Sequence, residues 1–388
     1  MSRDFSDTPS DMVVHSNEVQ SGDADTVSLA SDNLIDATIE TIEVMARQAG
    51  LTFGVYPVRR LNNSYHLILE RRDAGLNGSM QFTYRNPLRS TSPDLILKGA
   101  RSIVTFALPI TLHETTGELI LPHLLARYAR KDYYGILRQE LEKMSVSLGA
   151  LGVKSKVVLD SNELIDKEVA VRSGIGSYLK NSLVNVPGIG SATILGNLVV
   201  DIPLPRSKAP DRLVSCGRCR ICIDSCPTNA IGDNGAIDAR RCISWILQSP
   251  EEIDTKVLPA IGTRLYGCDI CQDVCPINRR SAYPKLEQLQ EIDEIAVEIL
   301  TVFSSSDEEI LSLLPHIYIY KRDVRLVRRN CVVAAANLGA GSKYETEILA
   351  EVTKLEGADP LYQPYVDYFF STRKGDSVTS ALNGRLQS

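Results

Sequence analysis

The 388-residue sequence contains no apolar run that approaches the roughly 20 residues needed to cross a bilayer. A secretory signal is also lacking, because the opening stretch MSRDFSDTPSDMVVHSNEVQSGDADTVSLASD is acidic, rich in serine and without an apolar segment. Disulfide frameworks are typical of small secreted chains, and nothing here indicates secretion, so the nine cysteines favour a metal site instead. The sequence therefore predicts a cytoplasmic protein with no membrane segment.

An excess of positive charge is lacking too. The chain has 42 Lys and Arg against 48 Asp and Glu, and its net charge of −6 argues weakly against bulk affinity for nucleic acid. A global charge can still hide a local basic patch. The length suggests roughly two or three domains. We expect a disordered leader over residues 1–32, because this stretch has little apolar surface to bury against its ordering entropy.

Helix and strand patterns alternate through the first half of the chain. We expect helices over 33–50, 65–75 and 162–174, and one long helix or a pair of helices over 121–152. Strands are expected over 51–58, Ala100–Ile110 and 154–161, with one or two further β segments over 192–205. Such alternation is typical of an α/β domain, here over residues 33–209. Asp160 falls at the C-terminal edge of one expected strand.

The remaining sequence divides into a cysteine-rich part, 210–285, and a helical C-terminal region, 286–388. In the latter, RDVRLVRRN leads into an Ala-rich helix and resembles one HEAT-type unit. A lone unit cannot bury its own apolar face, so we expect it to pack on the neighbouring domain. Cys331 lies among its apolar residues, and we interpret it as a buried, inert thiol.

Eight cysteines follow an iron–sulfur pattern. The run CGRCRICIDSCPTNAI has the spacing C-x2-C-x2-C-x3-C-P, in which the fourth cysteine ligates the other cluster of a two-cluster protein. The run CDICQDVCPIN lacks one ligand, which Cys242 would replace. We assign two [4Fe–4S] clusters, one held by Cys216, Cys219, Cys222 and Cys275, the other by Cys226, Cys242, Cys268 and Cys271. Alternatives are a pair of zinc sites and clusters with a purely structural role.

The cysteine runs and the segments around them resemble a known family. CGRCRICIDSCPTNAI, DARRCISWIL and RLYGCDICQDVCPIN, preceded by LGNLVVDIPLP, closely resemble the epoxyqueuosine reductases, cobalamin-dependent enzymes that complete the queuosine modification in tRNA. The similarity extends upstream to GSMQFTYRNPLRSTSPDLILKGARSIV, ARYARKDYYGILRQEL and LDSNELIDKEVAVRSGIG, and downstream to RDVRLVRRNCVVAAANLG, so it covers roughly residues 33–340.

The resemblance implies an α/β cobalamin-binding domain, a ferredoxin-like double [4Fe–4S] cluster domain and a HEAT-like C-terminal element. Electrons from an external low-potential donor would pass through the clusters to a base-off cobalamin and reduce the epoxide. Asp160 matches the family's catalytic aspartate, placed where a strand end would present it to a crevice. It would donate a proton, for which burial must raise its pKa. The alternative is a helix N-cap formed by Asp160 or Ser161.

Four further polar residues are candidate cofactor contacts by the same resemblance: Lys180, Asn181, Ser182 and Ser244. The alternative for each is ordinary loop polarity. The chain departs from the family at Ser177–Leu179, where Trp-Ile-Gly is usual, and around Tyr134, where a Trp-Gly turn and then Asp-Tyr-His are usual. These departures motivate two rival functions. One is a related reductase acting on an organohalide or another epoxide, and the other is an electron-transfer subunit without chemistry of its own.

The family's substrate implies a surface for a tRNA anticodon stem-loop. The stretch YKRDVRLVRRN offers basic residues, several three or four apart on one helix face. The predicted tRNA-binding residues are Lys321, Arg322, Arg325, Arg328 and Arg329. The alternative is a solvated face with salt bridges to SSSDEE. Tyr318 and Tyr320 would stack on bases or, more often at alternate positions, pack.

Overall fold

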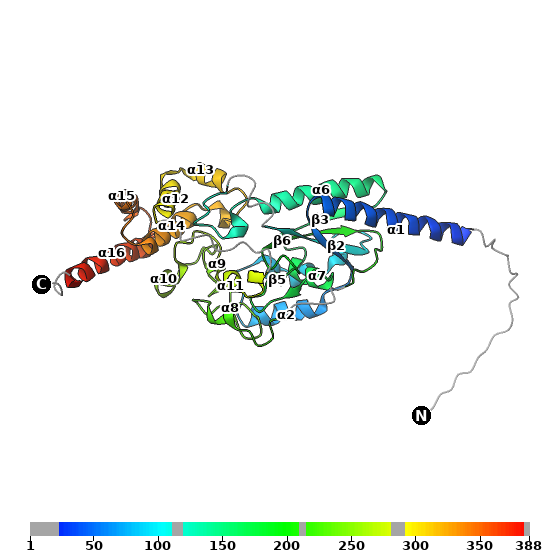
Figure 1. Ribbon diagram of the computed structural model, residues 1–388, viewed down its shortest axis with the longest axis horizontal. Coiled ribbons are helices and arrows are strands. Elements are labelled where there is room, and N and C mark those ends of the chain that lie inside the picture. The colour runs from blue at the N-terminus through cyan, green and yellow to red at the C-terminus, as the bar shows by residue number, and fades with distance from the viewer. Residues whose placement is uncertain (1–22, 111–118, 209–214, 281–291, 384–388) are drawn as a thin grey trace, which may run out of the picture.

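The computed structural model describes residues 23–110, 119–208, 215–280 and 292–383 (Figure 1). Four strands form the main sheet, in the order β1-β2-β6-β3. Their bounds are Thr52–Pro57 (β1), Ser102–Pro109 (β2), Ser155–Val158 (β3) and Thr193–Val200 (β6). Every neighbouring pair is antiparallel. The predicted mixture of helices and strands is present, but the crevice expected at the strand ends of a parallel sheet cannot explain the position of Asp160.

Helices cover both faces of this sheet. Alternate residues of β2 point in opposite directions, as a strand requires. Val104, Phe106 and Leu108 share a core with α1 (Asp23–Gln48) and α6 (Tyr133–Ala150). Ile103 and Ala107 face the other side, where α7 (Asp166–Arg172) packs. The sheet is thus buried on both faces, and polar side chains on the α7 face need partners within the protein.

Two helix boundaries differ from the prediction. The helix expected over 121–152 begins only at Tyr133, because Asp132 caps it by accepting a hydrogen bond from the Gly135 N–H at 2.7 Å. The residues before it form turns, and Leu125 makes a parallel bridge with Tyr266. Helix α1 begins at Asp23, so residues 23–32 of the predicted leader are helical. The rest of that leader, 1–22, lies outside the described residues.

The middle of the chain consists of short elements. These short elements include α2 (Asn62–Asp73), α3 (Phe82–Arg85), α4 (Pro87–Ser90), η1 (Pro93–Leu95), β4 (Ser177–Tyr178), β5 (Val184–Asn185), α8 (Ile221–Asp224), α9 (Ile243–Ile246), α10 (Leu258–Ile261) and α11 (Ile270–Asp273). In Figure 1, α2 and α8 lie along one edge of the molecule, and α1 and α6 lie along the opposite edge.

The C-terminal helices surround α14 (Arg325–Leu338). Its neighbours are α12 (Ile292–Ser304), α13 (Asp307–Leu313), α15 (Glu345–Leu355) and α16 (Gln363–Asn383). Their apolar side chains form one core with residues of the cysteine-rich part, including Leu258 and Ile261 of α10, and with Leu124 and Leu125. The predicted packing of the HEAT-like unit on its neighbour is therefore confirmed. Cys331 is fully buried in this core.

Within the described part of the chain, no helix is both long and apolar enough to cross a membrane.

Candidate active site

The eight cysteines of the pattern all carry free thiols. Burial raises the pKa of Cys222, and the neighbouring thiols of Cys216, Cys275 and Cys219 raise it further. Burial likewise raises the pKa of Cys271, followed by the thiols of Cys268 and Cys242. Burial raises the pKa of Cys242 as well, and the nearby thiol of Cys226 raises it further. Each of these cysteine pairs belongs to one of the two ligand sets that were assigned from the sequence. The ligand sets themselves stay a prediction.

The two sets adjoin, because Cys222 of one also raises the pKa of Cys271 in the other. Backbone groups point at the sulfurs: the Lys180 N–H donates to Cys216 Sγ at 3.4 Å and the Ala230 N–H to Cys226 Sγ at 3.3 Å. Hydrogen bonds of this kind tune the potential of a cluster. Within the described residues, no three His, Cys, Asp or Glu side chains converge as ligands of a single ion would. Free thiols in two adjoining groups, with N–H donors around them, fit two cubane clusters.

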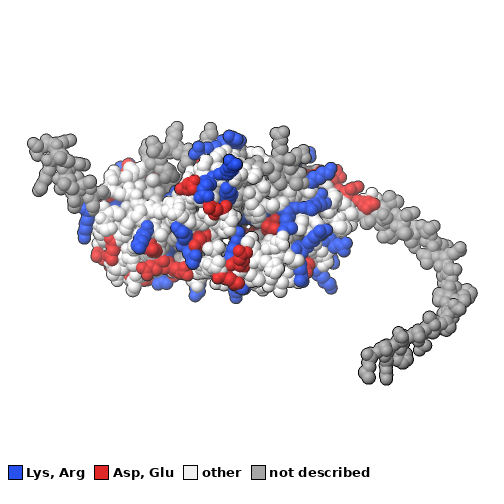
Figure 2. Space-filling view, turned by 90° about the horizontal axis from the view of Figure 1, so that it is seen from below, with Lys and Arg blue, Asp and Glu red and all other residues white. Residues whose placement is uncertain are grey.

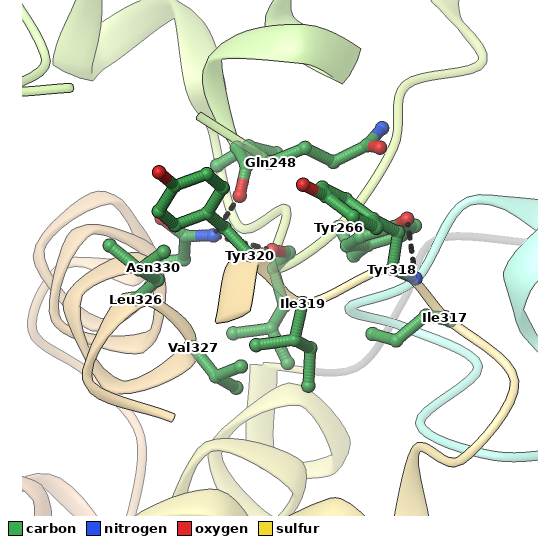
Figure 3. A pocket seen from close by; sticks show the side chains of 11 residues that line it. Gln248, Tyr266, Ile317, Tyr318, Ile319, Tyr320, Leu326, Val327 and Asn330 are labelled. Atoms are coloured by element: carbon green, nitrogen blue, oxygen red, sulfur yellow. Dashed lines mark hydrogen bonds between the residues drawn. The ribbon is translucent and has the colours of Figure 1, made fainter. Parts of the chain in front are cut away.

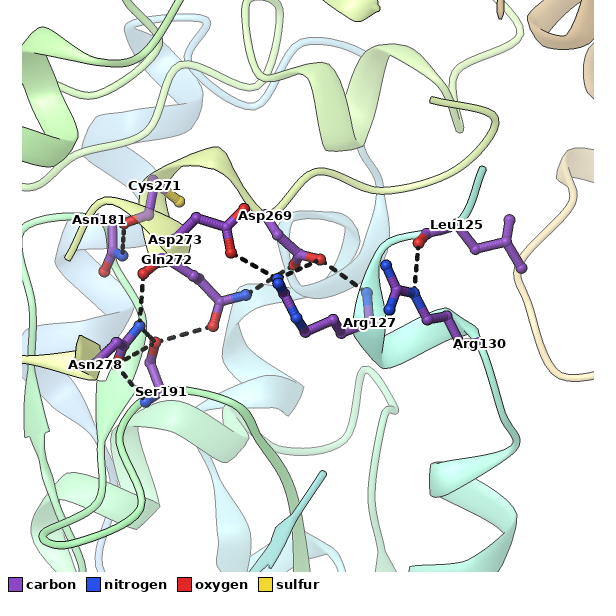
Figure 4. A network of polar contacts seen from close by, with 10 residues as sticks. All are labelled: Leu125, Arg127, Arg130, Asn181, Ser191, Asp269, Cys271, Gln272, Asp273 and Asn278. Atoms are coloured by element: carbon purple, nitrogen blue, oxygen red, sulfur yellow. Dashed lines mark hydrogen bonds and ion pairs between the residues drawn. The ribbon is translucent and has the colours of Figure 1, made fainter. Parts of the chain in front are cut away.

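A buried charged network holds the second cysteine loop in place (Figure 4). The Arg127 guanidinium is 2.6 Å from Asp273 and 3.4 Å from Asp269, and the Arg127 N–H donates to Asp269 at 2.8 Å. Asp269 lies between the thiols of Cys268 and Cys271 in sequence. Removing one partner of such a buried pair costs about 3–5 kcal/mol. The sequence analysis missed Arg127, because the segment that carries it was expected to be helical.

Asp160 occupies a loop two residues beyond the end of β3, with a left-handed backbone at φ 45°. The alternative interpretation, in which Asp160 or Ser161 is the N-cap of the following helix, is wrong, because Ile165 is the N-cap residue of α7. Solvent reaches the Asp160 side chain. Burial nevertheless raises its pKa, opposed by the positive charge of Arg138. From the accessibility and the desolvation together, we infer that this carboxyl lies in a partly open recess.

A buried polar chain supports this loop from the sheet. Thr105 and Asn197 face each other across β2 and β6, and the Thr105 hydroxyl donates to Asn197 Oδ1 at 2.8 Å. Asn197 Nδ2 donates to Asp166 Oδ1 at 2.6 Å, and the other Asp166 oxygen accepts the Asp160 N–H at 3.3 Å. Burial and the neighbouring Asp160 raise the pKa of Asp166 to about 8. The sequence analysis did not single out these three supporting side chains.

Other side chains around Asp160 are desolvated in the same way. Burial, then Asp160 and Asp166, raise the pKa of Tyr134. Burial lowers the pKa of Lys167, and the nearby sulfur atoms of Cys242 and Cys271 counteract part of this decrease because they favour the ammonium. Lys167 is exposed and Tyr134 only partly buried, so solvent reaches both. We infer that the recess extends from Asp160 to the thiol set that includes Cys242.

Two buried side-chain donors in this part of the molecule lack a hydrogen-bond partner within the described chain. Among the described residues, Nε of Arg71 and Nε1 of Trp245 are buried without a hydrogen-bond partner. The Arg71 guanidinium hydrogen-bonds Tyr84, and Arg71 is also a neighbour of Lys167. A corrinoid carries amide carbonyls around its ring, so a buried donor of Arg71 near Lys167 fits such a cofactor.

Four predicted cofactor contacts lie at the border between the sheet domain and the cysteine loops. Lys180 Nζ donates to the carbonyls of Gly217 and Cys219 at 3.0 and 2.9 Å. Asn181 donates to the Cys271 carbonyl at 3.3 Å. Ser182 donates to the Gly235 carbonyl at 2.6 Å, and Ser244 hydrogen-bonds the partly buried Tyr128. The first three therefore hold the cysteine loops, a structural role that the sequence analysis did not anticipate.

The predicted basic surface is only partly a surface. Arg329 is fully buried and donates to the carbonyls of Ser249 and Glu251 at 3.1 and 2.9 Å, so it cannot contact RNA, and the prediction for it is wrong. The helical periodicity of the sequence had grouped Arg329 with Arg325 and Arg328, and both of these arginines form ion pairs. Arg325 pairs with Asp323 and Asp359, and Arg328 pairs with Asp307 of the SSSDEE stretch. Lys321 and Arg322 are exposed.

The two tyrosines of this region differ in their contacts. Tyr318 is 52% exposed, and its N–H donates to the Tyr266 hydroxyl at 3.1 Å. Both tyrosines line a small pocket of about 10 Å³ beside Asn330 (Figure 3). Asn330 donates to the carbonyls of Leu247 and Leu265, which ties α14 to the cysteine-rich part.

Comparisons with known proteins agree with this description. Residues 215–278 match the family described as a 4Fe-4S double cluster binding domain. The chain is 32% identical over 286 residues to the epoxyqueuosine reductase of Bacillus subtilis, covering 70% of this chain and 71% of the relative. It is 29% identical to that of Vibrio cholerae, covering 81% and 86%.

Solved structures give the same result. A crystal structure of epoxyqueuosine reductase with an epoxyqueuosine-modified tRNA-Tyr stem loop superposes with a TM-score of 0.72 at 25% identity, covering 88% of this chain and 91% of that one. The enzyme from Streptococcus thermophilus gives a TM-score of 0.71 at 25% identity, covering 86% and 89%. The sequence similarity, the shared fold and the eight-cysteine pattern together show that this chain belongs to the epoxyqueuosine reductase family.

Proposed function

We propose that this chain reduces epoxyqueuosine in tRNA to queuosine in the cytoplasm. The observation that carries the proposal is that the accessible but desolvated Asp160 is hydrogen-bonded through its N–H to Asp166, whose neighbour in sequence, Lys167, lies near the thiols of Cys242 and Cys271. A site for proton donation beside a site for electron delivery is what a reductive removal of an epoxide oxygen needs. Relatives of this chain carry the name of that activity, and one was crystallised with the modified stem loop.

Eight thiols would hold the two clusters, in the sets assigned above. The loop that carries Cys216 has exposed neighbours, among them Gly217, Arg218 and Arg220, so the external donor would deliver electrons there. The set that includes Cys242 and Cys271 lies next to Lys167 and the recess, so it would pass electrons onward. Bound in the recess, a base-off cobalamin would supply the two-electron reduction of the epoxide.

Asp160 would donate the proton to the departing oxygen. Desolvation keeps its carboxyl protonated to higher pH than an exposed aspartate, which a proton donor near neutral pH requires. Asp166 and Asn197 would position the loop through the Asp160 N–H. A related structure, 26% identical with a TM-score of 0.69, is described with its catalytic aspartate loop swung out of the active site. The left-handed backbone of Asp160 suits a loop with more than one conformation.

A related reductase with another substrate is the second candidate. Tyr134 borders Asp160, and Tyr178 is a neighbour of Arg71, so two of the departures from the family pattern line the recess. The third candidate, an electron-transfer subunit, has no use for a desolvated acid in the recess.

One experiment separates the three candidates. The protein is purified anaerobically with cobalamin, its visible spectrum is recorded, and tRNA that carries epoxyqueuosine is assayed for queuosine. We expect bound corrinoid and turnover. Bound corrinoid without turnover of this tRNA would favour the second candidate. If the protein binds no corrinoid, the electron-transfer subunit is the candidate that remains.

A further inference from the structure

We propose that a cavity at the start of α2 binds a phosphate group, either as the free ion or as part of a small phosphomonoester. The inference goes beyond the proposed function and does not depend on it. Three observations carry it: a buried hydroxyl without a partner, a helix N-terminus without a cap, and positive charge with no lining acid. A fourth observation connects the cavity to the Asp160 loop.

The cavity has a volume of about 280 Å³ and lies between the start of α2 and the segment around the end of α4. Its lining residues include Arg60, Asn62, Tyr65, His66, Leu88 and Ser92. None of the lining residues is among those placed around Asp160 above, so this is a second site. Its volume is just below the roughly 300–1,000 Å³ of most small-molecule sites, so the ligand must be compact.

Ser92 supplies the observation that points directly to a ligand. The residue is only 1% exposed, and its hydroxyl makes no hydrogen bond within the described part of the chain. Buried hydroxyl groups in folded proteins nearly always have a partner. Because Ser92 also lines the cavity, a ligand with acceptor oxygens bound there would satisfy its hydroxyl.

Helix α2 begins at this cavity without a cap. Its N-cap residue is Leu61, whose side chain has no acceptor, and its first turn contains no acidic residue. The N–H groups of Asn62, Asn63 and Ser64 donate to no acceptor within the described residues. Free N–H groups at a helix N-terminus, together with the positive end of the helix dipole, favour an anion.

The charge around the cavity favours the same ligand. Arg60 and His66 line the cavity, and no Asp or Glu of the described chain does. Arg60 lies 3.7 Å from Asp94, but both side chains are largely exposed, so this pair is weak and the guanidinium is available to an anion. In Figure 2, which views the edge on which α2 lies, Lys and Arg side chains gather on the half nearer to α1.

A phosphate group matches this set of donors. Its several acceptor oxygens can accept hydrogen bonds from a guanidinium, a hydroxyl and helix N–H groups at the same time. The ring of Tyr65 and the side chain of Leu88 provide apolar walls for the rest of a small phosphomonoester. We therefore assign the cavity to a phosphate group rather than to a neutral ligand.

Segment 88–92 lines one side of the cavity and also holds the Asp160 loop. The Ser90 hydroxyl donates to a backbone carbonyl and the Arg89 guanidinium pairs with a carboxylate, both in residues 162–163 and both at 2.6 Å. An anion that ties this segment to the start of α2 would therefore restrain the residues that directly follow the Asp160 loop.

The test titrates inorganic phosphate, AMP and adenosine separately into the full chain with its clusters loaded, followed by calorimetry. We expect phosphate and AMP to bind and adenosine not to bind. Tighter binding of AMP than of phosphate would support a phosphomonoester as the ligand, and AMP that binds no more tightly would support the free ion. If neither phosphate nor AMP binds at millimolar concentrations, or if adenosine binds as tightly as AMP, the proposal is overturned.

Two variants locate the binding. Ser92→Ala and Arg60→Gln should each weaken phosphate binding roughly tenfold, because both remove a hydrogen bond to a charged group. Ser92→Ala should not lower the Tm of the protein without phosphate, since its hydroxyl has no partner there, but phosphate should raise the Tm less than in the wild type. The matched control is Arg59→Gln, an exposed neighbour of Arg60 that does not line the cavity. Wild-type affinity in Ser92→Ala, or an equal loss in Arg59→Gln, would contradict the assignment.

Hydrogen exchange of residues 161–163 tests the connection to the Asp160 loop. Phosphate should slow this exchange in the wild type and leave it unchanged in Ser92→Ala. Exchange that is the same with and without phosphate in the wild type would refute the connection. None of these assays uses tRNA, so a failure of this proposal is distinguishable from a failure of the proposed function.

Discussion

The backbone N–H of Asp160 donates a hydrogen bond to the carboxyl group of Asp166 across 3.3 Å. The loop that carries the proposed proton donor is thus held by a second acid, which Asn197 anchors to the sheet at 2.6 Å. Since Asn197 also donates to the Val158 carbonyl at the end of β3, one amide fixes both the start of the loop and the residue that holds it.

Asp166→Asn should lower turnover while the clusters and bound corrinoid stay. Asn197 and the Asp160 N–H donate to different oxygens of Asp166, and in asparagine an NH2 donor replaces one of these acceptors, so one of the two hydrogen bonds is lost. Misplacing a reacting group by about 1 Å can cost on the order of 10²-fold in rate. The measurement is single-turnover reduction, with Glu142→Gln on the exposed side of α6 as the control. Wild-type turnover in Asp166→Asn would mean that the loop needs no such anchor.

Asp166 should also make stability depend on pH. Its folded-state pKa of about 8 lies above the ordinary 3.8, so the folded protein holds the proton more tightly. That contribution is fully present below about pH 4 and is lost as the pH rises through about 8. Compared with Asp166→Asn, the wild type should therefore lose thermal stability between these values. Equal pH profiles of Tm in the two proteins would show that this carboxyl is not desolvated.

Arg138 should set the alkaline limit of activity. Its positive charge opposes the rise in the pKa of Asp160 that burial causes. In Arg138→Gln that pKa should rise further, so the loss of turnover with increasing pH should occur at higher pH. Asp160→Asn is the reference, with clusters and corrinoid bound and turnover reduced by roughly 10²–10⁴. A pH profile that does not move in Arg138→Gln would indicate that another group supplies the proton.

Particular residues show what the sequence can and cannot predict. The cysteine spacing is local, so the iron–sulfur pattern of the eight thiols could be recognised from the sequence, whereas Asp160 is predicted only by the resemblance to the family. The pair of Thr105 and Asn197 depends on the register of two strands whose residues lie 92 positions apart, which no local pattern contains. Periodicity put Arg325 and Arg329 near one another on α14 but could not tell which side of that helix is packed.

Paired cysteine variants should test the ligand sets. Cys226→Ala with Cys242→Ala removes two ligands of one assigned cluster, so about four irons per chain should remain. Cys222→Ala with Cys226→Ala removes one ligand from each assigned cluster. Both clusters should then be impaired, and the iron content should fall well below about four irons per chain. The measurement is iron content after anaerobic reconstitution. Equal iron in the two variants would contradict the assignment.

Arg329→Met should reduce stability and leave RNA binding unaffected. The guanidinium donates to the carbonyls of Ser249 and Glu251 and lies 6.0 Å from the ring centre of Tyr365. Methionine fills part of the space but leaves these carbonyls buried without donors, at a cost of about 3 kcal/mol.

Arg322→Met is the matched control, because its side chain is exposed on the same segment and its loss should change the free energy of unfolding by less than about 0.5 kcal/mol. Denaturant unfolding and the salt dependence of stem-loop affinity are measured on both variants. A normal stability with a reduced salt slope in Arg329→Met would return Arg329 to the RNA surface. We expect lower stability with the wild-type salt slope, because a side chain that no solvent reaches cannot neutralise a phosphate and release the counterions of the RNA.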